Sequence, residues 1–250
     1  MNKFFISVAD FKIKVSHEWK NNPSDMAYSI APADKCEFEL FLKKEDVRKE
    51  KELSKNEVGG FFESALHRKI AECFPLHNAF VLHSAAFDVD GMGIALAAHS
   101  GTGKTTHMLL WQKLLGDRLK IVNGDKPIVR FFDDKPEQPY AYGTPWNGKE
   151  HLGCNMRTPL KNICFIERAE RNSCEEISKA EAADLLFNQV YIPKDPQAAI
   201  NTLQLINRLI SCCKLWKIKC NMDIEAAQTA YNKIFETEKE NETEIQLCNK

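Results

Sequence analysis

The residues of this chain best suited to chemistry form one glycine-rich segment, residues 98–105, which reads Ala-His-Ser-Gly-Thr-Gly-Lys-Thr. It follows an apolar run at 93–98 and precedes a stretch of helical character at 107–111. Gly101 and Gly103 can adopt backbone angles closed to other residues, so successive N–H groups can face inward. Such groups bind a phosphate at the positive end of a helix. The pattern therefore predicts a strand, a phosphate-binding turn and a helix in succession.

Two side chains at the end of this segment suit a nucleoside triphosphate. Lys104 adds a mobile positive charge for the β- and γ-phosphates, and the Thr105 hydroxyl can ligate Mg²⁺. The segment has the pattern of a P-loop with Ala98 in place of the usual first glycine. We expect the contacts with ATP to come from Ser100, Gly101, Thr102, Gly103, Lys104, Thr105 and Thr106.

A single carboxylate follows the next expected strand. Residues 120–123 are expected to form a short buried strand that ends at Gly124 and Asp125. Ligand groups in open α/β sheets lie where strands end. A carboxylate there can coordinate the metal that bridges the phosphates, or accept a proton from a hydroxyl. The alternative is a turn aspartate before Lys126-Pro127.

Residues 142–150 form a second unusual segment, which combines Gly, Pro, an aromatic ring and a cation. It is either the lip of an acceptor or phosphate site, with Lys149 as the charge and Trp146 as the wall, or a wide turn with Trp146 folded into the core. Arg157 and Arg168 are further candidates for phosphate contacts.

The elements that must position these residues begin with a small β-rich lobe at 1–58. Loose alternation at 3–15 indicates one or two strands, and 36–42 indicates another. A turn is expected at 21–25. The charged run at 43–55 is expected to be a solvated connection, because acidic and basic residues interleave in it.

A domain built around the glycine-rich segment is expected at 59–236, followed by a disordered polar tail at 237–250. It opens with a helix at 61–74 and a hairpin around Asp90-Gly91. The hairpin strands are expected at 80–89 and 93–98, and a helix at 104–115. Further strands are expected at 120–123, 128–132, 139–142, 160–167 and 214–220, and further helices at 180–187, 196–211 and 223–235.

Composition excludes several classes of protein. The 250 residues are 44% hydrophobic with a formal net charge of −1, so nothing favours broad attraction to nucleic acid or to a membrane surface. No apolar run approaches the ~20 residues that span a bilayer, and we expect a cytoplasmic protein. The nine cysteines include no C-x-x-C pair and are expected to stay reduced, without a zinc site.

The layout resembles the C-terminal domain of HPr kinase/phosphorylase and its relative phosphoenolpyruvate carboxykinase. Three segments carry the resemblance. Leu82-His83-Ser84-Ala85-Ala86 with its turn matches the family's histidine-bearing strand and hairpin, 99–106 matches its P-loop, and 121–125 matches the end of its metal-binding strand. The family has two adjacent aspartates there, whereas this chain has Asp125 alone.

The resemblance implies a mixed α/β (α+β) fold of this P-loop type with the small lobe added. It implies an ATP- and Mg²⁺-dependent kinase that phosphorylates a serine or threonine hydroxyl of a protein, peptide or small molecule. Asp125, His83 and Lys104 are then catalytic, and Thr105 and Asp125 hold the metal, with Asp125 as ligand, base or both. A non-catalytic nucleotide-binding sensor and a carboxykinase-type enzyme stay open as alternatives, and a homo-oligomer is compatible with the sequence.

Overall fold

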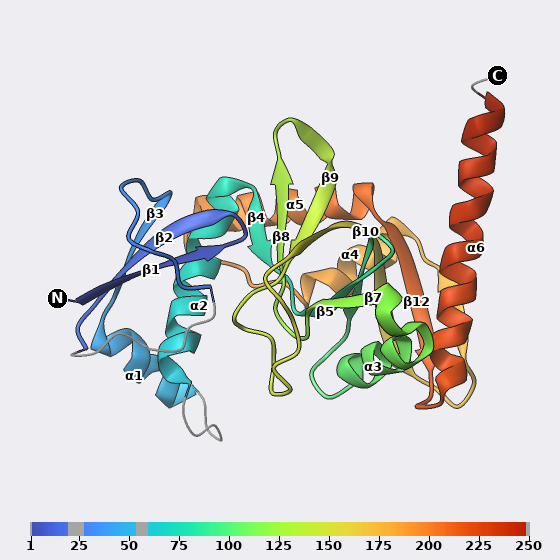
Figure 1. Cartoon of the computed structure of the whole chain (residues 1–250), viewed down its shortest axis with the longest axis horizontal. Helices are drawn as coiled ribbons and strands as arrows, with labels where there is room; N and C mark the ends of the chain where they lie inside the picture. Colours follow the sequence, from blue (N-terminus) through green and yellow to red (C-terminus); the bar gives the residue numbers. More distant parts are fainter. Residues whose placement is uncertain (1, 20–27, 54–59, 249–250) are drawn as a thin grey trace.

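The computed structural model describes residues 2–19, 28–53 and 60–248, with side chains up to residue 236. It has two sheets: a small one formed by the N-terminal segment and a larger mixed one with helices on both faces (Figure 1). The chain is therefore a mixed α/β protein, as the sequence predicts. The turn expected at 21–25 lies outside the described residues.

The small sheet is formed by β1 (Asn2–Val8), β2 (Phe11–His17) and β3 (Phe38–Leu42). β1 and β2 are antiparallel, and β3 runs parallel to β2. The hairpin between β1 and β2 turns at Ala9 and Asp10, whose φ angles are 52° and 61°. Alternate residues of β2 are buried, so this sheet has one apolar face to pack against the rest of the chain.

The charged run at 43–55 is not the expected connection, because much of it forms α1 (Lys44–Leu53). Asp46 accepts a hydrogen bond from the Lys43 backbone N–H at 2.8 Å near the start of the helix. Lys49 pairs with Glu45 one turn earlier at 3.1 Å. The interleaved charges thus support a helix through pairs four residues apart, rather than marking a solvated connection.

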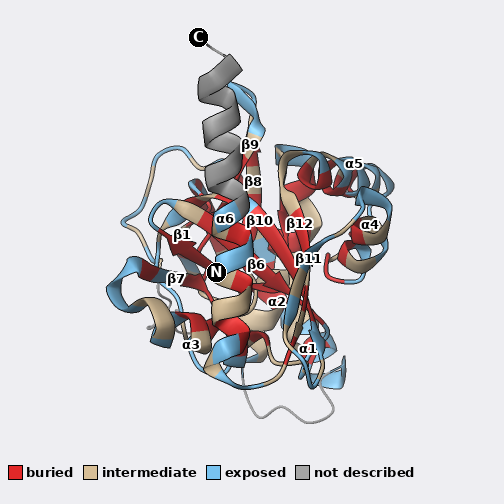
Figure 2. Cartoon of the chain, turned by 90° about the vertical axis from the view of Figure 1, so that its right-hand side faces the viewer, coloured by how far each residue is buried: buried red, intermediate tan, exposed pale blue. Residues whose placement is uncertain are grey.

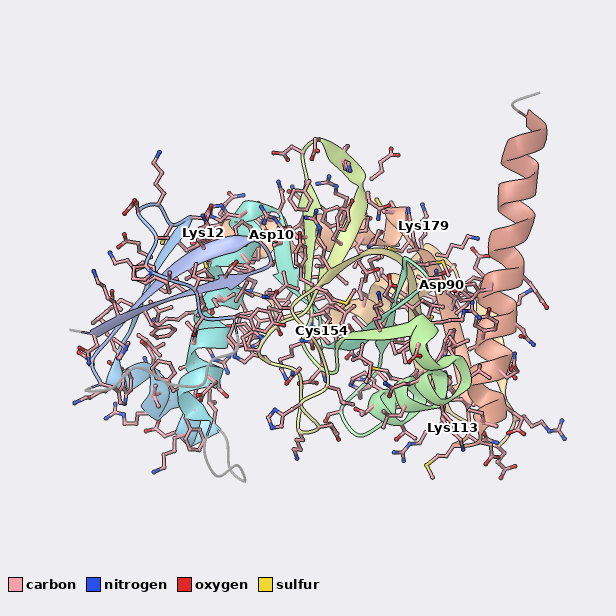
Figure 3. The ribbon with its side chains drawn as sticks, viewed as in Figure 1. Asp10, Lys12, Asp90, Lys113, Cys154 and Lys179 are labelled. Atoms are coloured by element: carbon pink, nitrogen blue, oxygen red, sulfur yellow. The ribbon has the colours of Figure 1, made fainter. Side chains whose placement is uncertain are left out.

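Helix α2 (Phe61–Cys73) joins the small sheet to the large one. Its Leu66 and Ile70 are fully buried in a core that includes residues of all three small-sheet strands and of β4 (Ala79–Val81) and β8 (Ile128–Phe132). Asp10, labelled in Figure 3, adds a polar link by accepting a hydrogen bond from the Tyr142 hydroxyl at 2.6 Å. The N-terminal lobe therefore shares its apolar core with the rest of the chain. The domain boundary at residue 58 stays a prediction.

The large sheet has the strand order β4-β8-β9-β10-β6-β5-β7. The long strand β10 pairs with β9 along its first residues and with β6 and β12 along its remainder, and β11 pairs with β12. The remaining bounds are β5 (Ser84–Val89), β6 (Met92–Ala97), β7 (Leu119–Asn123), β9 (Lys135–Tyr142), β10 (Arg157–Arg168), β11 (Ser173–Glu176) and β12 (Lys214–Cys220).

Helices cover both faces of this sheet because alternate strand residues point to opposite sides. In β6, Ile94 and Leu96 belong to the core beneath α3 and α6, whereas Ala95 and Ala97 belong to the core beneath α4 and α5. Figure 2 shows the buried strands between these helix layers. The bounds are α3 (Lys104–Leu115), α4 (Lys179–Phe187), α5 (Pro196–Cys212) and α6 (Ile224–Cys248), with short 3₁₀ turns at Phe74–His77 and Gly116–Arg118.

Two expected elements differ in the structure. The strand predicted at 80–89 is interrupted at Leu82 and His83, because β4 pairs with β8 while β5 pairs with β6 and β7. The last helix does not end near residue 235 but continues to Cys248, so most of the expected tail at 237–250 is helical. Its many Glu, Lys and Gln residues are good helix formers. Within the described parts of the chain, no helix combines the length and apolar character needed to cross a membrane.

Candidate functional site

The carboxyl ends of several strands meet at one edge of the large sheet. β6, β10 and β12 are parallel, and β7 runs in the same direction because β5 is antiparallel to both β6 and β7. Ligands in open α/β sheets usually bind at such an edge. Here it gathers the loop after β6, Asp125 after β7, Arg168 at the end of β10 and His83 just before β5, all of which line one cleft.

The glycine-rich loop, residues 98–103, joins β6 to α3 as the sequence predicts. Gly101 and Gly103 have φ angles of +78° and +122°, which residues with side chains rarely adopt. Gly103 is the N-cap of α3, so the first N–H groups of the helix receive no side-chain cap. Residues 100–107 line the cleft, and the positive end of the helix dipole therefore faces it.

Lys104 begins α3 and is almost fully buried, with 7% of its surface exposed. Its Nζ atom donates a hydrogen bond to the Ala98 carbonyl at 2.8 Å and lies 3.1 Å from Nε2 of His83. Burial lowers the pKa of Lys104, and the nearby Asp125 carboxylate partly opposes that shift. The ammonium group is thus held at the mouth of the loop, between the loop backbone and the histidine.

A buried asparagine shapes the turn that presents Asp125. The Asn123 side-chain oxygen accepts hydrogen bonds from the backbone N–H groups of Asp125 at 2.9 Å and Lys126 at 2.7 Å. Its amide nitrogen donates to the carbonyl and hydroxyl oxygens of Thr144. Sequence reasoning missed this role, although an Asn followed by Gly at a strand end is a known turn signal.

Asp125 lies between two nitrogen groups. Its Oδ1 atom is 3.3 Å from Nε2 of His83, and its Oδ2 atom accepts a hydrogen bond from Nζ of Lys126. Burial alone raises the pKa of Asp125, but the hydrogen bond with His83 and the Lys126 charge more than offset it and hold that pKa well below its usual value. The carboxylate is therefore ionised near neutral pH. Lys126 is a contact that the sequence did not predict.

The segment with Trp146 packs on both Asp125 and α2. Trp146 is half-buried; its indole N–H donates to the Glu63 carbonyl at 3.0 Å, and its ring lies 4.9 Å from that of His67. A Cβ atom added at Gly148 would lie 3.2 Å from Cβ of Asp125. Lys149 is exposed and lines the cleft. The two interpretations of this segment thus both have support: Trp146 anchors it to the apolar core, and the segment borders the cleft.

The cleft is larger than one small ligand needs. Its volume is about 2110 Å³, whereas single-ligand pockets usually measure roughly 300–1,000 Å³. Its lining includes the glycine-rich loop, residues of α2 and the stretch 188–191. The cleft therefore exceeds the usual size of a single-ligand pocket.

The residues predicted to hold Mg²⁺ face this cleft. Thr105 and Asp125 both line it. Among the described residues, no group of three or more His, Cys, Asp or Glu side chains is placed to hold a metal ion. Mg²⁺ in nucleotide sites usually needs only one or two protein ligands beside phosphate oxygens and water. A hydroxyl and an ionised carboxylate fit that requirement.

The two candidate arginines differ in position. Arg157 donates hydrogen bonds to Asp10 and to the Tyr142 hydroxyl, both at 2.9 Å, and is not among the residues that line the cleft. Arg168 lies at the cleft, where its Nε donates to the Thr102 carbonyl at 2.9 Å and its Nη2 donates to the Gly101 carbonyl. Arg168 therefore contacts the glycine-rich loop itself.

Comparisons with known proteins show a distant likeness in structure but none in sequence. No known family and no curated protein matches the sequence. Among solved structures, the chain is similar to an Hpr(Ser) kinase/phosphatase from Coxiella burnetii, with 10% sequence identity and a TM-score of 0.35. The match covers 63% of this chain and 98% of that one. This likeness concerns the fold alone and leaves the chemistry of the site to its own residues.

Proposed function

We propose that this chain is a kinase that binds ATP with Mg²⁺ and transfers the γ-phosphoryl group to a hydroxyl of an acceptor. One observation carries the proposal. Lys104, at the mouth of a glycine-rich loop and the start of a helix, lies within 3.1 Å of His83, which in turn lies 3.3 Å from an ionised Asp125. A phosphate-binding loop thus adjoins groups able to bind metal and move a proton.

The loop supplies the binding of the phosphate chain. The uncapped N–H groups at the start of α3 and the helix dipole favour a negative charge there, and Lys104 is a cation at the same point. Removing Lys104 from water is unfavourable for its charge, and a triphosphate offers a compensating anion. Phosphoryl transfer needs mostly positioning and charge neutralisation, which these groups provide.

The strand order supports one orientation of the proposed nucleotide. His83 precedes β5 and Asp125 follows β7, on one side of β6, whereas Arg168 ends β10 and Asn221 follows β12, on its other side. The γ-phosphate is expected on the side of His83 and Asp125. The nucleoside then extends toward the ends of β10 and β12, and the acceptor enters from the side of α2.

Asp125 and Thr105 would hold Mg²⁺, which neutralises charge on the transferring phosphates when it is bound. The low pKa of Asp125 suits a cation ligand better than a proton acceptor. His83, in contact with Asp125, is the other group able to accept the hydroxyl proton. Asp125 would thus act as the metal ligand and His83 as the proton acceptor. Both are predicted from the sequence to be catalytic together with Lys104.

The test is phosphotransfer from γ-labelled ATP into a cell lysate, followed by identification of the labelled species. We expect a labelled product that depends on Mg²⁺ and is absent with Lys104→Ala. Lys113→Ala, on the exposed face of α3, is the matched control and should behave as the wild type. Binding of ATP without any transfer or hydrolysis would contradict the kinase.

A nucleotide-binding sensor without catalysis is the second candidate, and the Lys126–Asp125 contact favours it. A lysine engaged with the only carboxylate at this turn competes with a metal ion for the same oxygen. In a sensor, ATP affinity should be nearly independent of Mg²⁺. The Lys126→Ala variant, like the wild type, should then release no phosphate from ATP. In a kinase, Lys126→Ala keeps Asp125 available and transfer persists.

A further inference from the structure

We propose that Arg168 is a positioning residue that holds the glycine-rich loop in its phosphate-binding form, an inference that rests on the phosphate site proposed above. Arg168 is the last residue of β10, the parallel neighbour of the strand that leads into the loop. Its two hydrogen bonds reach across this strand pair to the carbonyl oxygens of Gly101 and Thr102. It therefore contacts the backbone of the loop at and next to its first glycine.

These two carbonyls determine where the loop's N–H groups point. In a trans peptide group the C=O and N–H bonds point in opposite directions. The Thr102 carbonyl shares its peptide group with the N–H of Gly103, the residue just before Lys104. A guanidinium bound to that carbonyl therefore directs the Gly103 N–H away from Arg168. The Gly101 carbonyl is fixed in the same way, and the N–H of its peptide group, that of Thr102, donates a hydrogen bond to the His99 carbonyl at 3.2 Å inside the loop.

The loop needs such a clamp because glycine gives it many alternatives. Gly101 and Gly103 both have positive φ, and nothing lies within 4 Å of where their Cβ atoms would be. Packing therefore does not fix these two positions. Glycine loses more conformational freedom on ordering than any other residue, and a loop ordered before binding spares the ligand that loss. Donation from a cation to a carbonyl also polarises the peptide group and strengthens its N–H as a donor.

The planar fork of arginine suits this task better than a lysine. One guanidinium can donate to two adjacent carbonyls in fixed geometry, whereas an ammonium is a compact point charge on a flexible stem. Arg168 donates hydrogen bonds to these two carbonyls. Among the described residues, no carboxylate forms an ion pair with it. Arg168 is also exposed, so its removal leaves no cavity in the core. Effects of its substitution should therefore appear in binding more than in stability.

The experiment measures binding of two probes, Mg-ATP and Mg-tripolyphosphate, to the full chain by calorimetry. Tripolyphosphate carries the phosphate chain without a nucleoside. We expect Arg168→Gln and Arg168→Lys each to weaken both probes by a similar factor, about tenfold, with melting temperature nearly unchanged. The matched control is Arg171→Gln, an exposed arginine three residues further along, which should bind both probes as the wild type does.

Three results would overturn the inference. A loss of affinity for Mg-ATP alone would show that Arg168 contacts the nucleoside. Wild-type affinity in Arg168→Lys would show that Arg168 acts only through its positive charge on the phosphates. Unchanged binding with a lower melting temperature would make it structural. A wild-type chain that binds neither probe is distinguishable from all three, since it removes the proposed phosphate site itself and the inference with it.

Discussion

Nζ of Lys104 lies 3.1 Å from Nε2 of His83, although the two residues are 21 positions apart in the sequence. The same Nε2 atom lies 3.3 Å from Oδ1 of Asp125. One ring nitrogen cannot accept a hydrogen bond from Lys104 and donate one to Asp125 at the same time. If a bound phosphate drew Lys104 away, Nε2 would be free to pair with Asp125, so occupancy of the loop would be linked to the contact between His83 and Asp125.

The first prediction concerns Lys104. Lys104→Met keeps the length of the stem and removes the charge, so affinity for Mg-ATP should fall by at least tenfold, as measured by calorimetry at fixed salt. Lys113→Met is the matched control, since Lys113 lies on the same helix and is exposed (Figure 3). Equal affinity in Lys104→Met and wild type would remove the phosphate-binding assignment.

Asp125→Asn tests the carboxylate with little change in shape. If Asp125 holds Mg²⁺, transfer of the γ-phosphoryl group should drop by roughly a hundredfold or more, while ATP still binds. The measurement is initial rate against Mg²⁺ concentration, with Asp134→Asn, an exposed aspartate, as the control. Full activity at every Mg²⁺ concentration would show that another group performs this role.

Much of the local structure could be predicted because its signals are local. The Asp90-Gly91 hairpin, the strand–loop–helix around Gly101 and Gly103, and the strand ending at Asp125 all follow from periodicity and turn residues. The structure brings the residues that follow these signals to one edge of the sheet. The helix at 44–53 was missed because interleaved charges fit a loop and a helix with pairs four residues apart equally well.

The contacts that surround the site could not be predicted, because they join residues distant in sequence. Arg168 reaches the loop across 66 positions, and Trp146 reaches Glu63 across 83. Strand order decides which residues become neighbours, and pairing across a sheet leaves no periodic trace in the sequence. The contact of Lys126 with Asp125 is local, yet adjacent side chains in a turn have no fixed direction without the turn itself.

Gly148 tests whether the neighbouring segment positions Asp125. It has a φ of +86°, and an added Cβ would lie 3.2 Å from Cβ of Asp125. Gly148→Ala should therefore lower transfer several-fold beyond any effect on melting temperature. Gly91→Ala is the matched control, because Gly91 has a φ of +89° and nothing within 4 Å of its added Cβ. Equal transfer in the two variants would mean that the segment does not set the position of the carboxylate.

Trp146 and Lys149 separate the structural and functional interpretations of the same segment. Trp146→Ala should lower the stability by up to about 3 kcal/mol, because a half-buried aromatic ring is lost from the core beside α2. Trp146→Phe keeps an aromatic ring and loses the hydrogen bond to the Glu63 carbonyl, so it should lose less stability than Trp146→Ala.

If the segment borders an acceptor, Lys149→Ala should lower transfer at unchanged ATP affinity. Wild-type transfer by Lys149→Ala would leave the segment a structural turn.

His107 gives a prediction about pH. It is 2% exposed, neither ring nitrogen has a hydrogen-bond partner in the described structure, and burial lowers its pKa from 6.5 to about 4. Because the folded-state pKa lies below the unfolded one, the unfolded chain binds the proton first as pH falls. The contribution of His107 to stability is therefore complete above pH 6.5 and is lost between about pH 6.5 and 4.

His107→Leu should lose less stability than the wild type between pH 7.5 and 5, as measured by urea denaturation. The control is His151→Leu, because His151 is exposed beside the cleft. Identical pH dependence in His107→Leu and wild type would show that His107 does not titrate in this window.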